Sequence, residues 1–222
     1  MDKGQSSEPF IQLVKDLEPP GSLTDNISYD FAFSRVELPF ETFAGISFRI
    51  RYYVGVVINR NYGKVTKEED FLVHNALQAD SILDNPPIHM NIGLSGHLQL
   101  DVVFAHSKYH LKDVITGHFK FRELRIKVKH IEVCINKKEA SGEGGSVTEN
   151  KIITRLEIMD GEPVVGEVVP IRLFLSSIEG LTPTQREINN TFSCTYFLSI
   201  MIHDEEGRKF FKQHEFEVWR KK

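Results

Sequence analysis

The sequence predicts an all-β protein made of antiparallel strands, and three observations carry this prediction. Short runs rich in Val, Ile, Phe, Tyr and Thr recur along the chain, and Gly, Pro, Asn and Asp separate them. Between Arg125 and Lys129, the apolar residues Ile126 and Val128 alternate with basic ones, which is the period of two that a strand with one wet face requires. Helical spacing of apolar residues is scarce along the whole chain.

Each predicted strand is a run dominated by β-branched and aromatic residues, because such side chains suit a pleated, half-buried surface. The first run is also one of the longest, and the last lies close to the carboxyl terminus. In chain order the runs are Phe48–Asn59, Phe71–His74, Leu98–Phe104, Val114–Phe121, Arg125–Asn136, Ile152–Ile158, Val168–Leu175, Phe192–His203 and Phe211–Trp219. This number of strands allows two β-sandwiches in tandem.

Two segments interrupt the strand pattern. Residues Lys138–Asn150 contain no large apolar side chain except Val147, so they predict a long, mobile hairpin loop between two strands. The second break is Leu77–Pro87, where Asn85-Pro86-Pro87 cannot continue a strand ladder. We therefore expect a shorter N-terminal domain, residues 1–88, and a fuller C-terminal domain, residues 89–222.

The composition is that of an ordinary soluble protein. The 222 residues are 41% hydrophobic and 26% charged, which is enough apolar material for a sizeable core. A net charge of -4 gives no overall attraction to nucleic acid or to an anionic membrane. Cys134 and Cys194 are too few for a disulfide framework or a structural zinc site, and we expect both to be small buried hydrophobes. No secretory signal or membrane-spanning run is recognisable, which predicts a cytosolic protein.

No catalytic constellation is recognisable either, so we predict that the chain is not an enzyme and needs no cofactor and no metal. The histidines His106, His110 and His118 are close in sequence but lack helical placement and a supporting cysteine or carboxylate cluster. The glycine-rich segment 142–145 lacks the lysine and hydroxyl of a phosphate-binding loop. One alternative stays open: a metal- or small-molecule-binding β-barrel or jelly-roll protein, enzymes included, in which these histidines converge in a pocket.

Two large apolar residues stand directly before a predicted turn. Asp160-Gly161 is typical of a tight turn, and Ile158 and Met159 precede it. Strict alternation puts Ile158 on the core face of its strand and Met159 on the same face as the charged Glu157. Met159 is therefore the better candidate for an exposed apolar anchor.

Several multi-residue blocks together cover nearly all of the chain: Phe10–Arg51, with Pro20–Thr24 and Ser28–Phe31 inside it, then Ser107–Ile115, Glu157–Gly161, Pro170–Leu175, Thr182–Thr184 and the ending from Phe211 to Lys221. These blocks resemble the vacuolar protein sorting-associated protein 26 family, and they stand in the family's order.

The resemblance implies an arrestin-like fold, which is a pair of antiparallel, immunoglobulin-like β-sandwich lobes. It also implies that the N-terminal lobe is incomplete here, since the family's opening strands are missing, and such a lobe would expose an apolar face and unpaired strand edges. A protein of this family would be a non-catalytic adaptor of the retromer coat. It would be cytoplasmic, peripheral on endosomal membranes, and active in retrograde transport to the Golgi or the plasma membrane.

The same resemblance implies partners and the residues that contact them. Ile158, Met159, Asp160 and Gly161 match the family's loop that binds the large α-solenoid retromer subunit. Ile92 and the residue range around Phe211 match strands beside which the cytosolic tail of a transmembrane cargo lies, at a surface shared with a sorting nexin. The alternative reading of these last two positions is packing in the core at strand ends. No nucleic acid is expected as a partner, and membrane association would be indirect.

Overall fold

The computed structural model describes residues 7–22, 25–78 and 82–222, and strands dominate it. Part of the Pro20–Thr24 block and part of the predicted break at Leu77–Pro87 lie outside the described residues. Among the described residues, two short 3-10 helices accompany the strands, η2 (Glu143–Gly145) and η3 (Leu175–Ser177). The first four strands are β1 (Phe43–Ala44), β2 (Arg49–Ile50), β3 (Tyr52–Arg60) and β4 (Gly63–Phe71).

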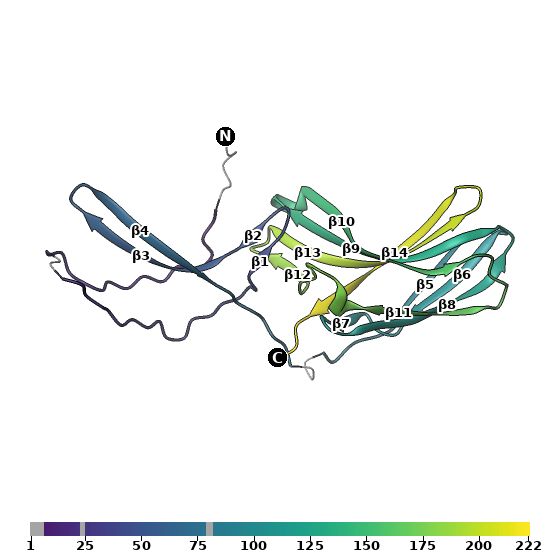
Figure 1. Cartoon of the computed structure of the whole chain (residues 1–222), viewed down its shortest axis with the longest axis horizontal. Helices are drawn as coiled ribbons and strands as arrows, with labels where there is room; N and C mark the ends of the chain where they lie inside the picture. Colours follow the sequence, from purple (N-terminus) through teal and green to yellow (C-terminus); the bar gives the residue numbers. More distant parts are fainter. Residues whose placement is uncertain (1–6, 23–24, 79–81) are drawn as a thin grey trace. The chain divides into compact units, whose positions relative to one another are not determined.

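The remaining ten strands form a β-sandwich of two sheets, visible as two layers in teal, green and yellow in Figure 1. The four-stranded sheet has the order β11-β8-β6-β5, with β5 (Ile88–Leu94), β6 (Leu98–Phe104), β8 (Val114–Leu124) and β11 (Val168–Phe174). The six-stranded sheet has the order β10-β9-β13-β14-β7, and β12 also pairs with β13. Its strands are β7 (Lys108–His110), β9 (Val128–Ser141), β10 (Val147–Asp160), β12 (Gln185–Ile188), β13 (Phe192–Asp204) and β14 (Lys209–Trp219).

Alternating side chains build the core between the two sheets. In β6, the residues at every second position from Leu98 to Phe104 are buried, while Asp101 and Val103 face outward and are half-exposed. Strand β13 contributes a matching row from the other sheet, including the fully buried Tyr196 and Ile200. The core therefore forms because the period of two in each strand directs one row of apolar groups inward.

Both cysteines lie in the six-stranded sheet and are buried as free thiols, which confirms the prediction made for them. Burial raises the pKa of the Cys134 thiol, with the charge of Glu132 adding to the effect. Burial also raises the pKa of Cys194. Neither residue is therefore poised as a thiolate nucleophile.

The predicted mobile loop over Lys138–Asn150 is wrong for most of its length. Strands β9 and β10 continue pairing as far as Ser141 and Val147, and Lys138 pairs with Asn150 in register. Only residues 142–146 connect the two strands. Polar residues extend this ladder because backbone hydrogen bonds and contacts with β13 stabilise it without a continuous apolar row.

The chain divides into two compact units, residues 1–39 and residues 40–222. Within the first unit, the described residues contain neither helix nor strand. Within the second unit, β3 and β4 pair only with each other in the described structure. That hairpin exposes apolar side chains on its strands: Tyr53, Val54, Val56, Val57, Ile58, Val65 and Phe71. The domain boundary near residue 88 stays a prediction.

Two buried carboxylates attach residues 41–47 to the sandwich. Glu139 on β9 accepts hydrogen bonds from the backbone N–H groups of Ile46, at 2.7 Å, and Ser47, at 2.9 Å. Glu41 accepts a hydrogen bond of 2.7 Å from the guanidinium of Arg220, just beyond β14. Both acids are buried, and each joins segments that are far apart in the sequence.

Candidate functional site

The segment Ile158–Gly161 lies at the end of β10, an outer strand of the six-stranded sheet. Ile158 and Met159 are both half-buried, and Asp160 and Gly161 are exposed. Neither apolar side chain is therefore sealed inside the sandwich. Each keeps surface that a partner could cover.

A β-bulge changes which way these side chains face. Glu157 pairs with Glu132 and Met159 pairs with Ile131, so Ile158 is an extra residue without a partner in β9. Met159 consequently shares the face of the buried Ile131 rather than the face of Glu157, and the strict alternation predicted from sequence is wrong at this point. One inserted residue shifts every later side chain to the opposite face.

The turn that follows connects two sheets and does not close a hairpin. Gly161 has a φ of 96°, a backbone conformation that residues with a Cβ rarely adopt, and its N–H donates to the carbonyl of Lys129 at 3.0 Å. The chain then crosses to β11 of the other sheet. On the way it exposes Val164 and Val165, at 65% and 60%, two apolar residues that sequence reasoning did not single out.

The second predicted surface involves the edges of two neighbouring strands. Strand β5 is the outermost strand of the four-stranded sheet, and β14 pairs with β7 only over Glu217–Trp219. The Nζ atom of Lys212 on β14 donates to the carbonyl of Asn91 on β5 at 2.9 Å, which joins the two edges. In the described structure, residues 88–94 and 209–216 each leave one edge without a strand partner.

The two residues predicted for that surface differ in exposure. Phe211 is 69% exposed and pairs with Met201 on β13. Ile92 is 4% exposed and pairs with Leu100 in the core face of its sheet. Phe211 can therefore contact a partner with its ring, whereas Ile92 can contribute only through the backbone of the β5 edge.

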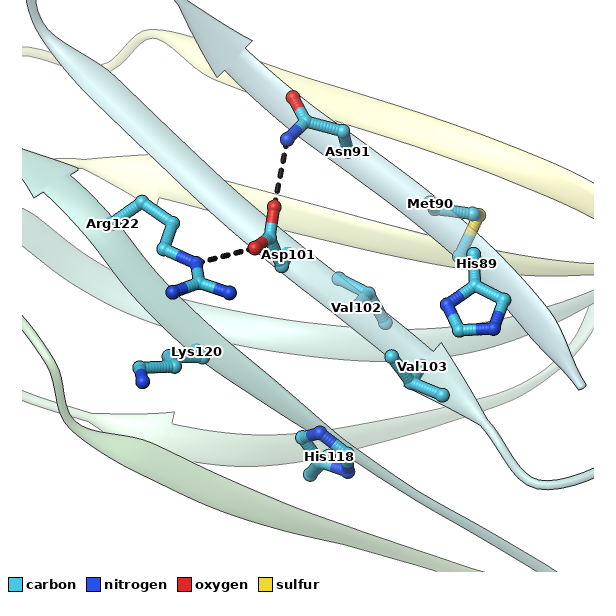
Figure 2. Close-up of a pocket in the computed structure, with 9 residues that line it drawn as sticks. All are labelled: His89, Met90, Asn91, Asp101, Val102, Val103, His118, Lys120 and Arg122. Atoms are coloured by element: carbon cyan, nitrogen blue, oxygen red, sulfur yellow. Dashed lines mark hydrogen bonds and ion pairs between the residues drawn. The ribbon is translucent and has the colours of Figure 1, made fainter.

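An open hollow of about 360 Å³ lies on the outer face of the four-stranded sheet (Figure 2). Asp101 stands in it between two partners: it accepts a hydrogen bond of 2.8 Å from the amide of Asn91 and pairs with the guanidinium of Arg122. The Arg122 bond is the largest influence that holds the pKa of Asp101 below its usual range. The negative charge of Asp101 is therefore already balanced by Arg122 within the sheet.

The histidines of the open alternative do not meet in this hollow. His118 lines it together with His89, but His106 and His110 do not. The ring of His106 packs against Tyr109, and that of His110 packs against Trp219. Among the described residues, the three histidines thus form no common metal site.

A different cluster forms on the outer face of the six-stranded sheet, where His130, Glu132 and His203 come together from β9 and β13. Burial is the main cause that lowers the pKa of His203, and the neighbouring His130 lowers it further. Sequence reasoning missed this cluster because the residues are far apart along the chain. Only the pairing of β9 with β13 brings them together.

Fold and surfaces together define a class: an all-β sandwich protein with apolar residues at a strand end and with free strand edges. In the described part of the chain, no helix is long and apolar enough to cross a membrane.

The sequence comparisons then identify the family. A family model described as vacuolar protein sorting-associated protein 26 matches residues 1–207. The chain belongs to this family, as its resemblance predicted, and the fold is the family's arrestin-like all-β fold.

Curated relatives agree with this assignment. Vacuolar protein sorting-associated protein 26B from Homo sapiens is 45% identical over 221 residues, which are 99% of this chain and 65% of that protein. The protein of the same name from Danio rerio is 44% identical over 99% of this chain and 66% of its own length. The chain therefore spans about two thirds of the length of these relatives.

A comparison of folds also found the sporulation control protein Spo0M from Bacillus subtilis. It aligns with 56% of this chain and 50% of its own, at 10% sequence identity and a TM-score of 0.43. That similarity is too low to support an argument.

Proposed function

We propose that this protein is a non-catalytic adaptor subunit of the retromer cargo-selective complex. It binds the large α-solenoid subunit and helps to recognise the cytosolic tails of transmembrane cargo for retrograde transport from endosomes to the Golgi or the plasma membrane. It is cytoplasmic, and it is peripheral on endosomal membranes through its partners. The observation that carries the proposal is the partly exposed apolar end of β10, in a chain of the vacuolar protein sorting-associated protein 26 family.

Docking on the solenoid subunit would bury apolar surface at that strand end. Ile158 and Met159 are half-buried before binding, and Val164 and Val165 extend the apolar surface a few residues further. Full burial of a large aliphatic side chain contributes about 1.5–3 kcal/mol before the costs of association. Because these side chains stand on a paired strand and a short connection, little of that gain is lost to ordering.

The double substitution Ile158→Asp/Met159→Asn tests the docking segment. We expect it to weaken capture of the α-solenoid subunit roughly ten- to hundredfold, because a charge and an amide would be desolvated at the centre of an apolar interface. The affinity is measured by titration calorimetry with the purified solenoid subunit. The thermal midpoint of the variant alone shows that its fold is retained.

Val147→Asp is the matched control, because Val147 is an exposed apolar residue at the opposite end of the same strand. Its affinity for the solenoid subunit should equal that of the wild type. Equal affinity of the double variant and the wild type would remove Ile158–Gly161 from the proposed interface.

Cargo recognition is proposed at the joined edges of β5 and β14. An edge strand offers unpaired N–H and C=O groups, so an extended peptide can add to it as a further strand. The exposed ring of Phe211 provides a side-chain contact beside these edges, and the buried Ile92 keeps β5 fixed in the sheet. Backbone bonds would then supply affinity, and side chains such as Phe211 would supply the choice of peptide.

The cargo surface is tested with a cargo-tail peptide in the presence of a sorting nexin. Phe211→Asp should weaken peptide binding roughly tenfold, measured by fluorescence anisotropy, since an exposed aromatic contact is lost. Phe174→Asp is the control, because Phe174 is an exposed aromatic residue on β11, at the other edge of the four-stranded sheet.

The strand-addition mode itself is tested by N-methylating alternate amides of the peptide. Methylation removes the donors that would bond to β5 or β14, so binding should fall, and amide exchange over residues 88–94 should no longer be slowed by the peptide. A methylated peptide that binds as well as the unmodified one would contradict strand addition.

A further inference from the structure

The outer face of the six-stranded sheet carries two histidines and a glutamate that no part of the proposed function uses. His130 on β9 lies opposite His203 on β13 in the antiparallel register, and Glu132 follows His130 on the same face of β9. Their side chains are 20%, 15% and 15% exposed, so all three are mostly enclosed. The sheet therefore holds three potential ligand groups on a rigid surface.

The distances within the cluster are close to those of a chelating site. His203 Nε2 lies 3.6 Å from Glu132 Oε2, and His130 Nε2 lies 3.9 Å from Glu132 Oε1. One ligand atom from each residue can be chosen so that all lie within 4.8 Å of one another. Ligand atoms bound at about 2.0–2.2 Å around a tetrahedral zinc ion are about 3.4 Å apart, so the three ligand atoms come within reach of one ion once the side chains turn toward it.

Two polar atoms of this cluster lack hydrogen-bond partners. Glu132 Oε2 and His203 Nε2 are both inaccessible to solvent, and the 3.6 Å between them is just beyond hydrogen-bond length. Arg155 Nη1 stands 3.8 Å from Glu132 Oε2, which is beyond hydrogen-bond length, and its side chain is largely exposed. Unsatisfied buried polar atoms are uncommon and costly, and a bound ion would satisfy both of these at once.

The imidazole rings of His130 and His203 stack, with centroids 4.2 Å apart and planes 19° apart. In this arrangement their nitrogen lone pairs run side by side. A metal ion would turn one ring out of the stack so that the two lone pairs converge. The neutral imidazole nitrogen and the carboxylate oxygen are ligands suited to zinc and to neighbouring divalent transition metals.

From these observations we propose that His130, Glu132 and His203 form a binding site for one divalent transition-metal ion of the zinc class. Water completes the coordination. The exposed Asp160 pairs with His130 in the β10–β9 register and adds negative charge beside the site. The site departs from the expectation of a metal-free chain. It does not depend on the proposed transport function.

The first experiment titrates Zn²⁺ into the whole chain after removal of metal by a chelator. We expect one ion per chain by calorimetry, and Co²⁺ used as a probe should give visible absorption bands of a nitrogen- and oxygen-ligated ion. His203→Ala and Glu132→Gln should each weaken Zn²⁺ binding roughly tenfold or more, since each removes a direct ligand. Glu132→Gln keeps the size of the side chain, so it serves where the alanine variant folds poorly.

His118→Ala is the control, because His118 is an exposed histidine on the other sheet and belongs to no such cluster. It should bind Zn²⁺ with the affinity of the wild type. The histidine ring signals of the wild-type protein give a second measurement: Zn²⁺ should shift those of His130 and His203. Absence of a stoichiometric ion, or unchanged affinity in His203→Ala and Glu132→Gln, would overturn the site.

Discussion

Replacing Glu139 with alanine is expected to lower the free energy of unfolding by about 3–5 kcal/mol, the cost of breaking a buried ion pair from one side. The carboxylate is buried and lies 2.9 Å from the ammonium group of Lys137, which is itself buried. Loss of Glu139 would leave that ammonium without its counter-charge and would free the N–H groups of Ile46 and Ser47. The aromatic ring of Phe43, 4.8 Å from Lys137 Nζ, compensates for only part of this loss.

Urea unfolding followed by circular dichroism measures the effect, and amide exchange at Ile46 and Ser47 locates it. Glu139→Gln should cost less than Glu139→Ala, because the amide oxygen still accepts the two backbone bonds. Glu149→Ala is the control, since Glu149 is an exposed acid that pairs with Glu139 in the β10–β9 register. Equal stability of Glu139→Ala and the wild type, with unchanged exchange at Ile46, would contradict this account.

The lowered pKa of Glu139 also predicts how the stability of the protein depends on pH. Burial acts to raise the pKa of this carboxyl, but the bond from Ser47 N–H, the neighbouring Lys137 and the bond from Ile46 N–H outweigh burial and hold the pKa below its ordinary 4.5. A lowered folded-state pKa stabilises the protein above the unfolded-state value, and this contribution is lost as pH falls through the folded-state value. Wild type should therefore lose stability below about pH 4.5, and Glu139→Gln should lose less.

Replacing Arg220 with alanine should lower the free energy of unfolding by about 3 kcal/mol. The guanidinium donates to both carboxylate oxygens of Glu41, from Nη2 at 2.7 Å and from Nε at 3.2 Å. Glu41 is 3% exposed, and its other contacts include a bond of 3.0 Å from the N–H of Asn75 and the ring of His74, whose Nδ1 lies 3.5 Å from Glu41 Oε1. Removal of Arg220 would leave the buried Glu41 carboxylate without its two-point arginine partner and would loosen residues 41–75 from the end of β14.

The single tryptophan, Trp219, is adjacent to Arg220 and reports this change by its fluorescence during urea unfolding. Arg220→Lys should be intermediate, because an ammonium group keeps the charge but not the planar two-point contact. Arg172→Ala, at an exposed position on β11, should leave stability within about 0.5 kcal/mol of the wild type. Indistinguishable unfolding of Arg220→Ala and Arg172→Ala would show that the Glu41 contact does not stabilise the fold.

Several strand positions followed from the sequence. The predicted run Leu98–Phe104 coincides with β6, and Phe192–His203 differs from β13 by one residue at its end. Other strands were missed: β4 is rich in charged residues, β12 is only a short strand against β13, and β5 was not among the predicted runs although its residues alternate. The ends of β9 and β10 were missed as well, because polar residues there pair across strands instead of facing a continuous core.

At both candidate sites, the sequence indicated the segment, and the strand pairing decided which way its side chains face. The segment Ile158–Gly161 was recognisable in the sequence, but the bulge at Ile158, which reverses the face of Met159, depends on the partner strand. Phe211 was selected together with Ile92, yet one side chain is exposed and the other is buried. Periodicity gives the face of a side chain only while the register is unbroken, and it does not show which edges stay unpaired.

The sequence by itself determined the family, the all-β class and the residues of the proposed docking segment, because these depend on residue identity and local alternation. The tertiary structure decided which distant residues meet. His130 and His203 become neighbours through strand register, and Glu139 reaches Ile46 across a long stretch of chain. Local propensity carries no information about such pairs, since their contact energy exists only after the strands have assembled.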